Sequence, residues 1–150
     1  MVTHIFHERQ RGGYCRLHAL NNLVGKQICT PVQFDKHCDN FDILNKFSKG
    51  TSKSQLFYNN GNMDNIFGYI LNTYNYDYEM KHYEFCKIKN AMHNSKTVGY
   101  ILYTKTHALC IKNCNGKFYL IDSMKAHPQL VNPVQYCKQR NLGVIQVYKK

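Results

Sequence analysis

The spacing of apolar residues changes near Tyr76, and this change limits the possible folds more than any other feature of the sequence. Before it, apolar residues recur about every 3.6 positions, as in helices that bury one face. After it, they form short runs rich in aromatic and β-branched residues, which are typical of strands. Helices followed along the chain by an antiparallel sheet predict an α+β domain with N-terminal helices packed on the sheet.

Start and stop signals place the helices of the first half. A first helix is expected from about Cys15 to Leu23, with Gly25 directly beyond it as a terminator. Thr30-Pro31 combines an N-cap residue with proline at the first helical position, and so predicts a second helix. The segment Asn45–Asn62 is polar and gives no clear element. A third helix should follow it and end near Tyr74.

The second half of the chain contains the expected strands. Its clearest signal is the turn-forming run 113–116 between two apolar runs, which predicts a β-hairpin. The last helix is expected over Pro133–Arg140. The remaining segments are strands over Tyr78–Phe85, Val98–Tyr103, His107–Lys112, Lys117–Asp122 and Gly143–Tyr148, and a short helix over Ile88–His93.

Length and composition indicate one globular domain over residues 1–150. The chain has 150 residues, 43% of them hydrophobic, and no long linker divides it. No stretch approaches the roughly 20 apolar residues that span a bilayer, and the first residues do not form a secretory signal. We therefore expect an intracellular monomer in the cytoplasm, with the nucleus as the alternative. Abundant lysine, asparagine and tyrosine are typical of AT-rich coding, and a viral member would act in the host-cell cytoplasm.

Charge and cysteine content argue against several kinds of partner. The net charge of +11 would suit nucleic acid or an anionic membrane. The basic residues are scattered, however, without a basic run, a zinc-finger spacing or a phosphate-binding glycine loop, so no specific nucleic-acid partner is expected. Seven irregularly spaced cysteines form a poor disulfide framework and favour reduced thiols. No metal or other cofactor is expected, because no pair of ligands has a zinc spacing.

The strongest chemical signal is Cys15, which follows a glycine pair and opens the first helix. A thiol at a helix N-terminus lies at the positive end of the helix dipole, beside N–H groups without an intrahelical acceptor, so its thiolate is favoured. Gln10, five residues upstream, could donate to an oxyanion together with the Cys15 N–H. The pattern predicts a nucleophilic cysteine.

The hairpin supplies a base and a carboxylate on one face. If the turn is Cys114-Asn115, or the four residues 113–116, His107 lies directly opposite Asp122. If Asn115-Gly116 forms the turn, the two meet on the diagonal, with roughly 7–8 Å between their Cα atoms. A carboxylate beside an imidazole fixes its tautomer and stabilises the imidazolium. In either register His107 and Asp122 lie on one face of the hairpin. Together with Cys15 they are the predicted catalytic residues.

Other residues compete for these roles. His7, His18 and His127 are alternative bases, although His18 lies one turn after Cys15 and is expected to pack or cap. Two pairs could be offered as metal ligands, namely Cys15 with His18 and Cys110 with Cys114. Buried, inert thiols are expected at Cys29, Cys38, Cys86, Cys110 and Cys137, and an exposed turn thiol at Cys114.

The residues named so far carry a resemblance. The run Ile5–Arg11, followed by Cys15 and by His18–Leu23, resembles the opening of a Josephin domain, a papain-like family of ubiquitin proteases. The short, single-domain Josephins are the most similar. Further matches follow in the family's order: Gly61–Asp64 before a helix, His107 opening a strand, and Phe118–Ser123 closing the hairpin. The resemblance spans about residues 4–148 and implies the papain-like Josephin fold.

The resemblance also implies an activity and its residues. Josephins hydrolyse the (iso)peptide bond after the C-terminal Gly-Gly of ubiquitin through an acyl-enzyme intermediate. Cys15 matches the family's nucleophile, His107 the general base, Asp122 the orienting member and Gln10 the oxyanion-hole glutamine. The implied partners are ubiquitin, polyubiquitin and ubiquitinated proteins. A helical arm that gates ubiquitin corresponds to Val32–Tyr58.

The chain departs from the family pattern beside the expected base. Ala108 follows His107 where an aromatic residue is common, and the sequence contains no tryptophan. Only nine acidic residues are present to meet the arginines of ubiquitin's tail. The alternative function is therefore a module that binds ubiquitin or a ubiquitin-like protein with little turnover.

Overall fold

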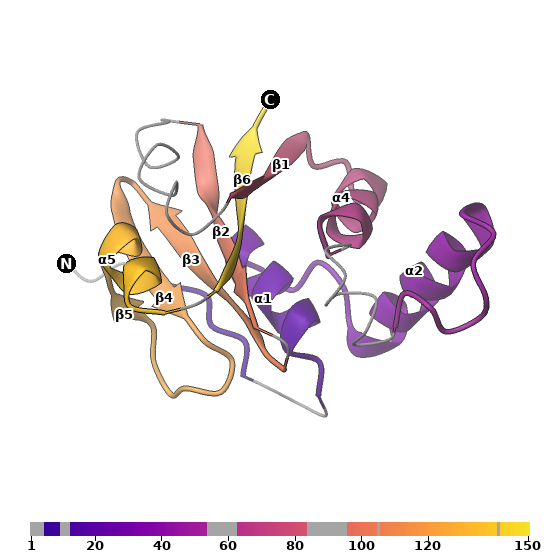
Figure 1. The fold of residues 1–150 in the computed structure, drawn as a ribbon, viewed down its shortest axis with the longest axis horizontal. Coiled ribbons are helices and arrows are strands. Elements are labelled where there is room, and N and C mark those ends of the chain that lie inside the picture. Colours follow the sequence, from indigo (N-terminus) through magenta and orange to yellow (C-terminus); the bar gives the residue numbers. More distant parts are fainter. Residues whose placement is uncertain (1–4, 10–12, 54–62, 84–95, 105, 141) are drawn as a thin grey trace.

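The computed structural model describes residues 5–9, 13–53, 63–83, 96–104, 106–140 and 142–150, and it confirms the α+β class (Figure 1). Helices come first along the chain and most strands later. The elements are α1 (Cys15–Val24), α2 (Pro31–Leu44), α4 (Met63–Thr73), β1 (Tyr78–Tyr83), β2 (Thr97–Tyr103), β3 (Ala108–Cys114), β4 (Lys117–Ile121), β5 (Gln129–Leu130), α5 (Pro133–Lys138) and β6 (Gly143–Lys149).

The strands form one antiparallel sheet whose order differs from their order in the sequence. The order is β1-β6-β2-β3-β4-β5, so β6 lies between β1 and β2. Helix α1 packs on β3, β2 and β4, whereas α4 packs on β1 and α2. Figure 1 shows α2 extending away from the sheet on the side of α4, and α5 on the sheet face opposite α1. The helix that begins with Cys15 thus lies directly against the hairpin.

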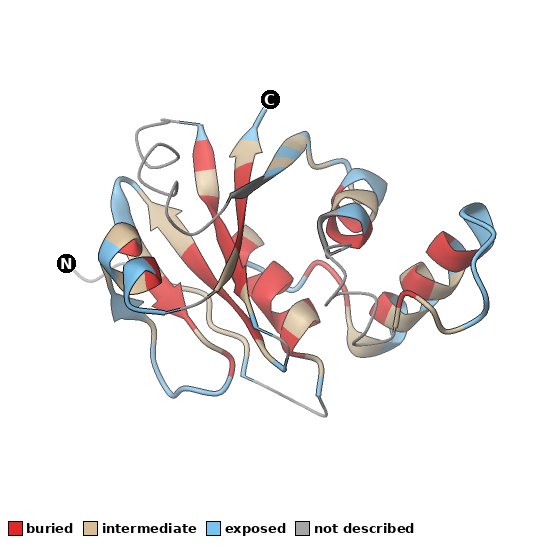
Figure 2. Cartoon of the chain, in the orientation of Figure 1, coloured by how far each residue is buried: buried red, intermediate tan, exposed pale blue. Residues whose placement is uncertain are grey.

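The alternation of side chains along the strands divides the core between the two faces of the sheet. Ile101 and Ile145 belong to the cluster shared with α1, α2 and α4, whereas Tyr100 and Val144 belong to the cluster under α5. All four side chains are almost completely buried. Figure 2 shows this burial along the middle of the central strands. The sheet is therefore covered on both faces.

The helix signals in the sequence are confirmed. Helix α1 begins at Cys15 and ends at Gly25, whose N–H donates to the Asn21 carbonyl over 2.9 Å. Helix α2 begins with a capping box, in which the Thr30 hydroxyl accepts from the Gln33 N–H and the Gln33 amide accepts from the Thr30 N–H. These contacts satisfy backbone groups that helix ends leave without partners.

The hairpin between β3 and β4 selects one of the two registers considered from the sequence. Cys114 pairs with Lys117, which leaves Asn115 and Gly116 as the turn. Both have positive φ, 55° and 89°, as a type I′ turn requires. The Gly116 N–H also donates to the Asn113 side chain over 2.8 Å. The expected partners at the far end of the hairpin therefore lie on the diagonal.

Some element bounds differ from the sequence expectations. Strand β3 begins at Ala108, not at His107, because the His107 backbone bonds back to Thr104 and belongs to the preceding turn. Strand β5 was not expected, since two residues are too few to show an alternating pattern. Three expectations concern residues that the structure does not describe. They are the helix over Ile88–His93, the end of the expected strand at 84–85, and residues 54–62 of the segment without a clear element.

Candidate active site

The hairpin brings His107 and Asp122 into direct contact. His107 immediately precedes β3 and Asp122 immediately follows β4, and His107 Nε2 lies 2.7 Å from Asp122 Oδ1. Thr104 fixes the backbone of His107, accepting from its N–H over 3.2 Å and donating to its carbonyl over 2.9 Å. Asp122 Oδ1 also accepts from the Met124 N–H over 3.0 Å. The orientation of the imidazole is therefore set from both strands.

Cys15 meets this pair from helix α1. Its thiol is hydrogen-bonded to the His107 side chain and to the backbone of Ala108, and only 6% of the residue is exposed. Because Nε2 of His107 is engaged by Asp122, Nδ1 is the ring nitrogen left for the thiol. The structure thus brings together Cys15, His107 and Asp122, whereas Gln10 lies outside the described residues.

The contacts favour charged forms of all three groups. Burial opposes ionisation of the Cys15 thiol, but hydrogen bonds from His107 and Ala108 outweigh it and lower the thiol pKa. The hydrogen bond to Asp122, followed by that to Cys15, raises the pKa of His107 to about 9. Burial also opposes ionisation of Asp122, yet the bonds from His107 and the Met124 N–H lower its pKa. The contacts therefore shift the balance towards a thiolate beside an imidazolium, the form in which a cysteine attacks a carbonyl carbon.

Comparison with known proteins assigns this geometry to a family. The Josephin family model matches residues 10–140, which is most of the chain. This chain belongs to the Josephin family. Josephins are cysteine proteases of the deubiquitinase type. A search of curated proteins found no match.

The other histidines of this Josephin chain lie in different settings. His7 Nε2 donates to the backbone carbonyl of Asp122 over 2.9 Å, so it holds the main chain that carries the carboxylate. His18 is 2% exposed and bonded to Glu8, as expected for a packing residue. His127 is exposed in the segment before β5. Among these candidates for the base, the structure places only His107 on the Cys15 thiol.

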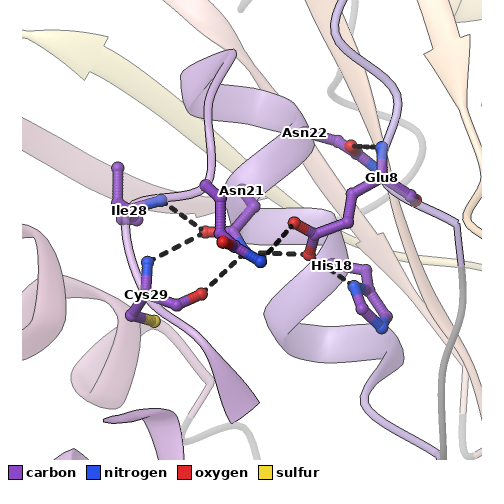
Figure 3. A network of polar contacts seen from close by, with 7 residues as sticks. Glu8, His18, Asn21, Asn22, Ile28 and Cys29 are labelled. Atoms are coloured by element: carbon purple, nitrogen blue, oxygen red, sulfur yellow. Dashed lines mark hydrogen bonds and ion pairs between the residues drawn. The ribbon is translucent and has the colours of Figure 1, made fainter.

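A buried polar network ties the N-terminal segment of the Josephin fold to α1 (Figure 3). The Glu8 carboxylate accepts from His18 Nδ1 over 2.5 Å and from Asn21 Nδ2 over 2.9 Å. Asn21 in turn donates to the Cys29 carbonyl over 3.0 Å, and Asn22 accepts from the Glu8 N–H over 2.5 Å. The chain is therefore anchored two residues before Gln10.

Sequence reasoning missed this network, although a signal for it was present. His18 and Asn21 are three residues apart and therefore share one face of α1. Polar side chains on the buried face of a helix need partners inside the protein. Glu8 is the only acidic residue of the sequence upstream of them, and a search for their partner would have found it.

Residues on both sides of Cys15 contact the α2 region. Tyr14 donates its hydroxyl to Asp35 of α2 over 2.7 Å, and that hydrogen bond is the main reason why the Tyr14 pKa is raised. The Arg16 guanidinium donates to the Lys53 carbonyl over 3.5 Å. The segment that carries Lys53 is fixed to α2 because the Lys53 ammonium lies 3.0 Å from Asp39. The start of α1 and the α2 region therefore form one connected unit.

The remaining described cysteines lack such surroundings. Burial raises the pKa of Cys29 to about 12 and that of Cys137 to about 11, which disfavours their thiolates. Cys110 is completely buried, and burial likewise raises its pKa. Cys15 and five others are free thiols: Cys29, Cys38, Cys110, Cys114 and Cys137. Within the described part of the chain, no cluster of three or more His, Cys, Asp or Glu side chains could hold a metal.

Proposed function

We propose that this Josephin protein is a cysteine deubiquitinase that hydrolyses the (iso)peptide bond after the C-terminal Gly-Gly of ubiquitin. The observation that carries the proposal is the contact of the Cys15 thiol with an imidazole that is itself held by a carboxylate. A nucleophile, a base and an orienting acid in contact are what acyl transfer by a thiol requires. Membership of the family supports ubiquitin as the substrate.

The first half of the proposed reaction transfers the ubiquitin acyl group to the enzyme. The Cys15 thiolate attacks the carbonyl carbon of ubiquitin's terminal glycine, and the carbonyl oxygen becomes an oxyanion. The His107 imidazolium then gives its proton to the leaving amine as the C–N bond breaks. The products are a free lysine amine and a thioester at Cys15.

The second half releases ubiquitin. His107, now neutral, takes a proton from a water molecule, which attacks the thioester carbon. The C–S bond breaks, ubiquitin leaves as a carboxylic acid that loses its proton to solvent, and the thiolate and imidazolium are restored. Asp122 remains ionised throughout and stabilises the imidazolium in both halves.

The oxyanion would be stabilised at the N-terminus of α1. The Cys15 N–H belongs to the first turn, whose N–H groups have no acceptor within the helix. The proposal assigns the second donor to the Gln10 amide, as the family pattern implies. Removal of one such donor typically lowers kcat by about 10²–10³-fold, and Gln10→Ala should do the same.

Helix α2 offers an apolar surface for recognition of ubiquitin. Val32, Ile43 and Leu44 are largely exposed on α2, and Phe47 lies half-exposed just beyond it. A group of exposed apolar side chains on one element is typical of a surface that binds another protein. The contacts of Tyr14 and Arg16 with this region support its proposed role as the arm that gates ubiquitin.

The alternative, ubiquitin binding with little turnover, is favoured by one observation. Ala108 and Leu109 are 1% and 5% exposed, so neither side chain can form the wall that an aromatic residue commonly provides in this family. If the tail is held poorly, the reacting carbonyl is positioned poorly, and a misplacement of about 1 Å can cost about 100-fold in rate.

A ubiquitin derivative with an electrophile at its C-terminus tests the proposal. The wild-type protein should form one covalent adduct, and Cys15→Ala should form none. The matched control is Cys114→Ala, since Cys114 is the partly exposed thiol of the β3–β4 hairpin and should not be modified. No adduct on the wild type, or an adduct retained by Cys15→Ala, would refute the role of Cys15. Binding of ubiquitin without cleavage of chains of any linkage would establish the alternative.

A further inference from the structure

An open pocket of about 540 Å³ lies at the end of the sheet away from His107 and Asp122. It is formed where the last turn of α1 meets the first residues of β2, the β3–β4 turn and the end of β6. Because β2 and β3 are antiparallel, the start of β2 and the end of β3 share this edge, and the start of β3 lies at the opposite one. The pocket is therefore separate from the candidate active site.

Three lysines line this pocket, namely Lys96, Lys112 and Lys149, and its lining contains no carboxylate from the described part of the chain. The neighbouring acid Asp77 is not among the lining residues. Its side chain is 80% exposed, and its Oδ1 lies 3.6 Å from Lys150 Nζ. A cleft lined by side chains of one charge sign concentrates the electrostatic field and attracts counter-ions. A multiply charged anion fits such a cleft.

The ammonium of Lys112 is held in place by the end of α1. A methyl group built on Gly25 would lie 2.2 Å from Lys112 Nζ, so the ammonium packs directly against the residue that caps the C-terminus of that helix. The C-terminus of a helix carries a partial negative charge that favours a cation nearby. Lys112 is also half-buried, which limits the motion of its side chain.

Hydrogen bonds hold the wall around the lysines in shape. Asn113 donates to the Thr97 carbonyl over 3.0 Å and accepts from the N–H of the turn residue Gly116 over 2.8 Å. The buried Gln146 amide donates to the Thr97 hydroxyl over 2.7 Å. The pairing of β2 with β6 also shifts between Thr97 and Gly99, a bulge of the kind that proteins use next to binding sites. The pocket is thus built from fixed backbone.

We propose that this pocket binds a phosphorylated ligand with at least two negative charges. Its volume lies in the range of sites for small ligands. Lysine binds phosphate as a point charge, and a phosphate group concentrates nearly two negative charges at one point, more than a carboxylate does. Leu23 and Val24 provide an apolar wall for the part of the ligand without charge. The phosphate groups could belong to a free metabolite or to a lipid headgroup.

Titration calorimetry with three probes tests the proposal: ATP, inositol hexakisphosphate, and phosphatidylcholine vesicles that contain a phosphoinositide. At least one probe should bind saturably, and its affinity should fall as salt rises. Lys112→Gln should raise the Kd about tenfold or more. The double variant K96Q/K149Q should do the same, and it keeps the test valid if Lys112→Gln fails to fold, because both of its residues are exposed.

The matched control removes two charges elsewhere. K36Q/K138Q changes exposed lysines of α2 and α5, so it lowers the net charge equally and should leave the Kd unchanged. Soluble probes that bind without vesicle binding would identify a free ligand, and binding of vesicles through the same lysines would identify a headgroup. Absence of saturable binding to all three probes, or an equal loss in the control, would overturn the proposal. None of these results depends on turnover at Cys15. Failure of the phosphate-binding proposal can therefore be distinguished from failure of the proposed function.

Discussion

The substitution Asp122→Asn isolates the contribution of one charge to the candidate site. An asparagine keeps an oxygen that can accept from His107 Nε2 and from the Met124 N–H, but it carries no negative charge. The imidazolium of His107 then loses the largest cause of its raised pKa. We expect a smaller population of the thiolate–imidazolium pair and a lower kcat/KM.

The size of the effect follows from the pKa of His107. The rise from 6.5 to about 9 corresponds to about 3.4 kcal/mol, shared between Asp122 and Cys15. Because solvent reaches 20% of the His107 side chain, we reduce the part due to Asp122 to about 2 kcal/mol. This sets an upper limit of about thirtyfold on the loss in kcat/KM.

The pH profile of kcat/KM with a fluorogenic ubiquitin substrate provides the assay. A raised pKa means that His107 keeps its proton until the pH approaches about 9, so wild-type activity should fall only above that value. In Asp122→Asn the fall should begin at lower pH, towards the ordinary value of 6.5. By the same linkage, the contact stabilises the wild-type fold fully below pH 6.5 and ceases to do so as the pH rises through about 9.

The control for this experiment is Asp77→Asn, which removes the same charge from an 80% exposed position and should leave the profile unchanged. The assigned role of Asp122 would be refuted by two results together. The first is that kcat/KM falls over the same alkaline pH range in the wild type and in Asp122→Asn, and the second is that the substitution lowers kcat/KM less than about threefold.

Three further predictions concern the frame around the site. Gly99→Ala should lower the free energy of unfolding by about 1–3 kcal/mol in urea titrations, because its Cβ would lie 2.3 Å from the Ile111 carbonyl oxygen; an unchanged midpoint would contradict this packing. Glu8→Gln should cost about 1–3 kcal/mol by the same measurement, since α1 loses charge-assisted hydrogen bonds, and a neutral result would show that the network contributes little. Tyr14→Phe and Asp35→Asn should show a coupling of about 0.5–1.5 kcal/mol in a double-mutant cycle, and strictly additive effects would contradict their contact.

Local signals were sufficient for much of the fold and for part of the candidate site. The helix start at Cys15, the cap at Thr30 and the turn at Asn115-Gly116 each depend on a few neighbouring residues, so the sequence displays them directly. The hairpin pattern then placed His107 and Asp122 on one face, because an even-length turn keeps both side chains on the same side.

Long-range contacts were not predictable in this way. No periodicity shows that β6 lies between β1 and β2, since strand order depends on packing across the whole sheet. The bonds from Tyr14 to Asp35 and from His7 to the Asp122 carbonyl likewise join residues far apart along the chain. The hairpin pattern also could not show that α1 packs on β3, the contact that puts the Cys15 thiol on His107.

The central position of β6 has a consequence for synthesis of the protein. Ribosomes release the chain from its N-terminus, so β1 and β2 emerge well before residues 143–149, the strand that joins them. Until then the nascent sheet exposes the edges of β1 and β2, and its two halves are not bonded to each other. We expect chaperone contacts and sensitivity to early termination to persist until nearly all of these residues have left the exit tunnel.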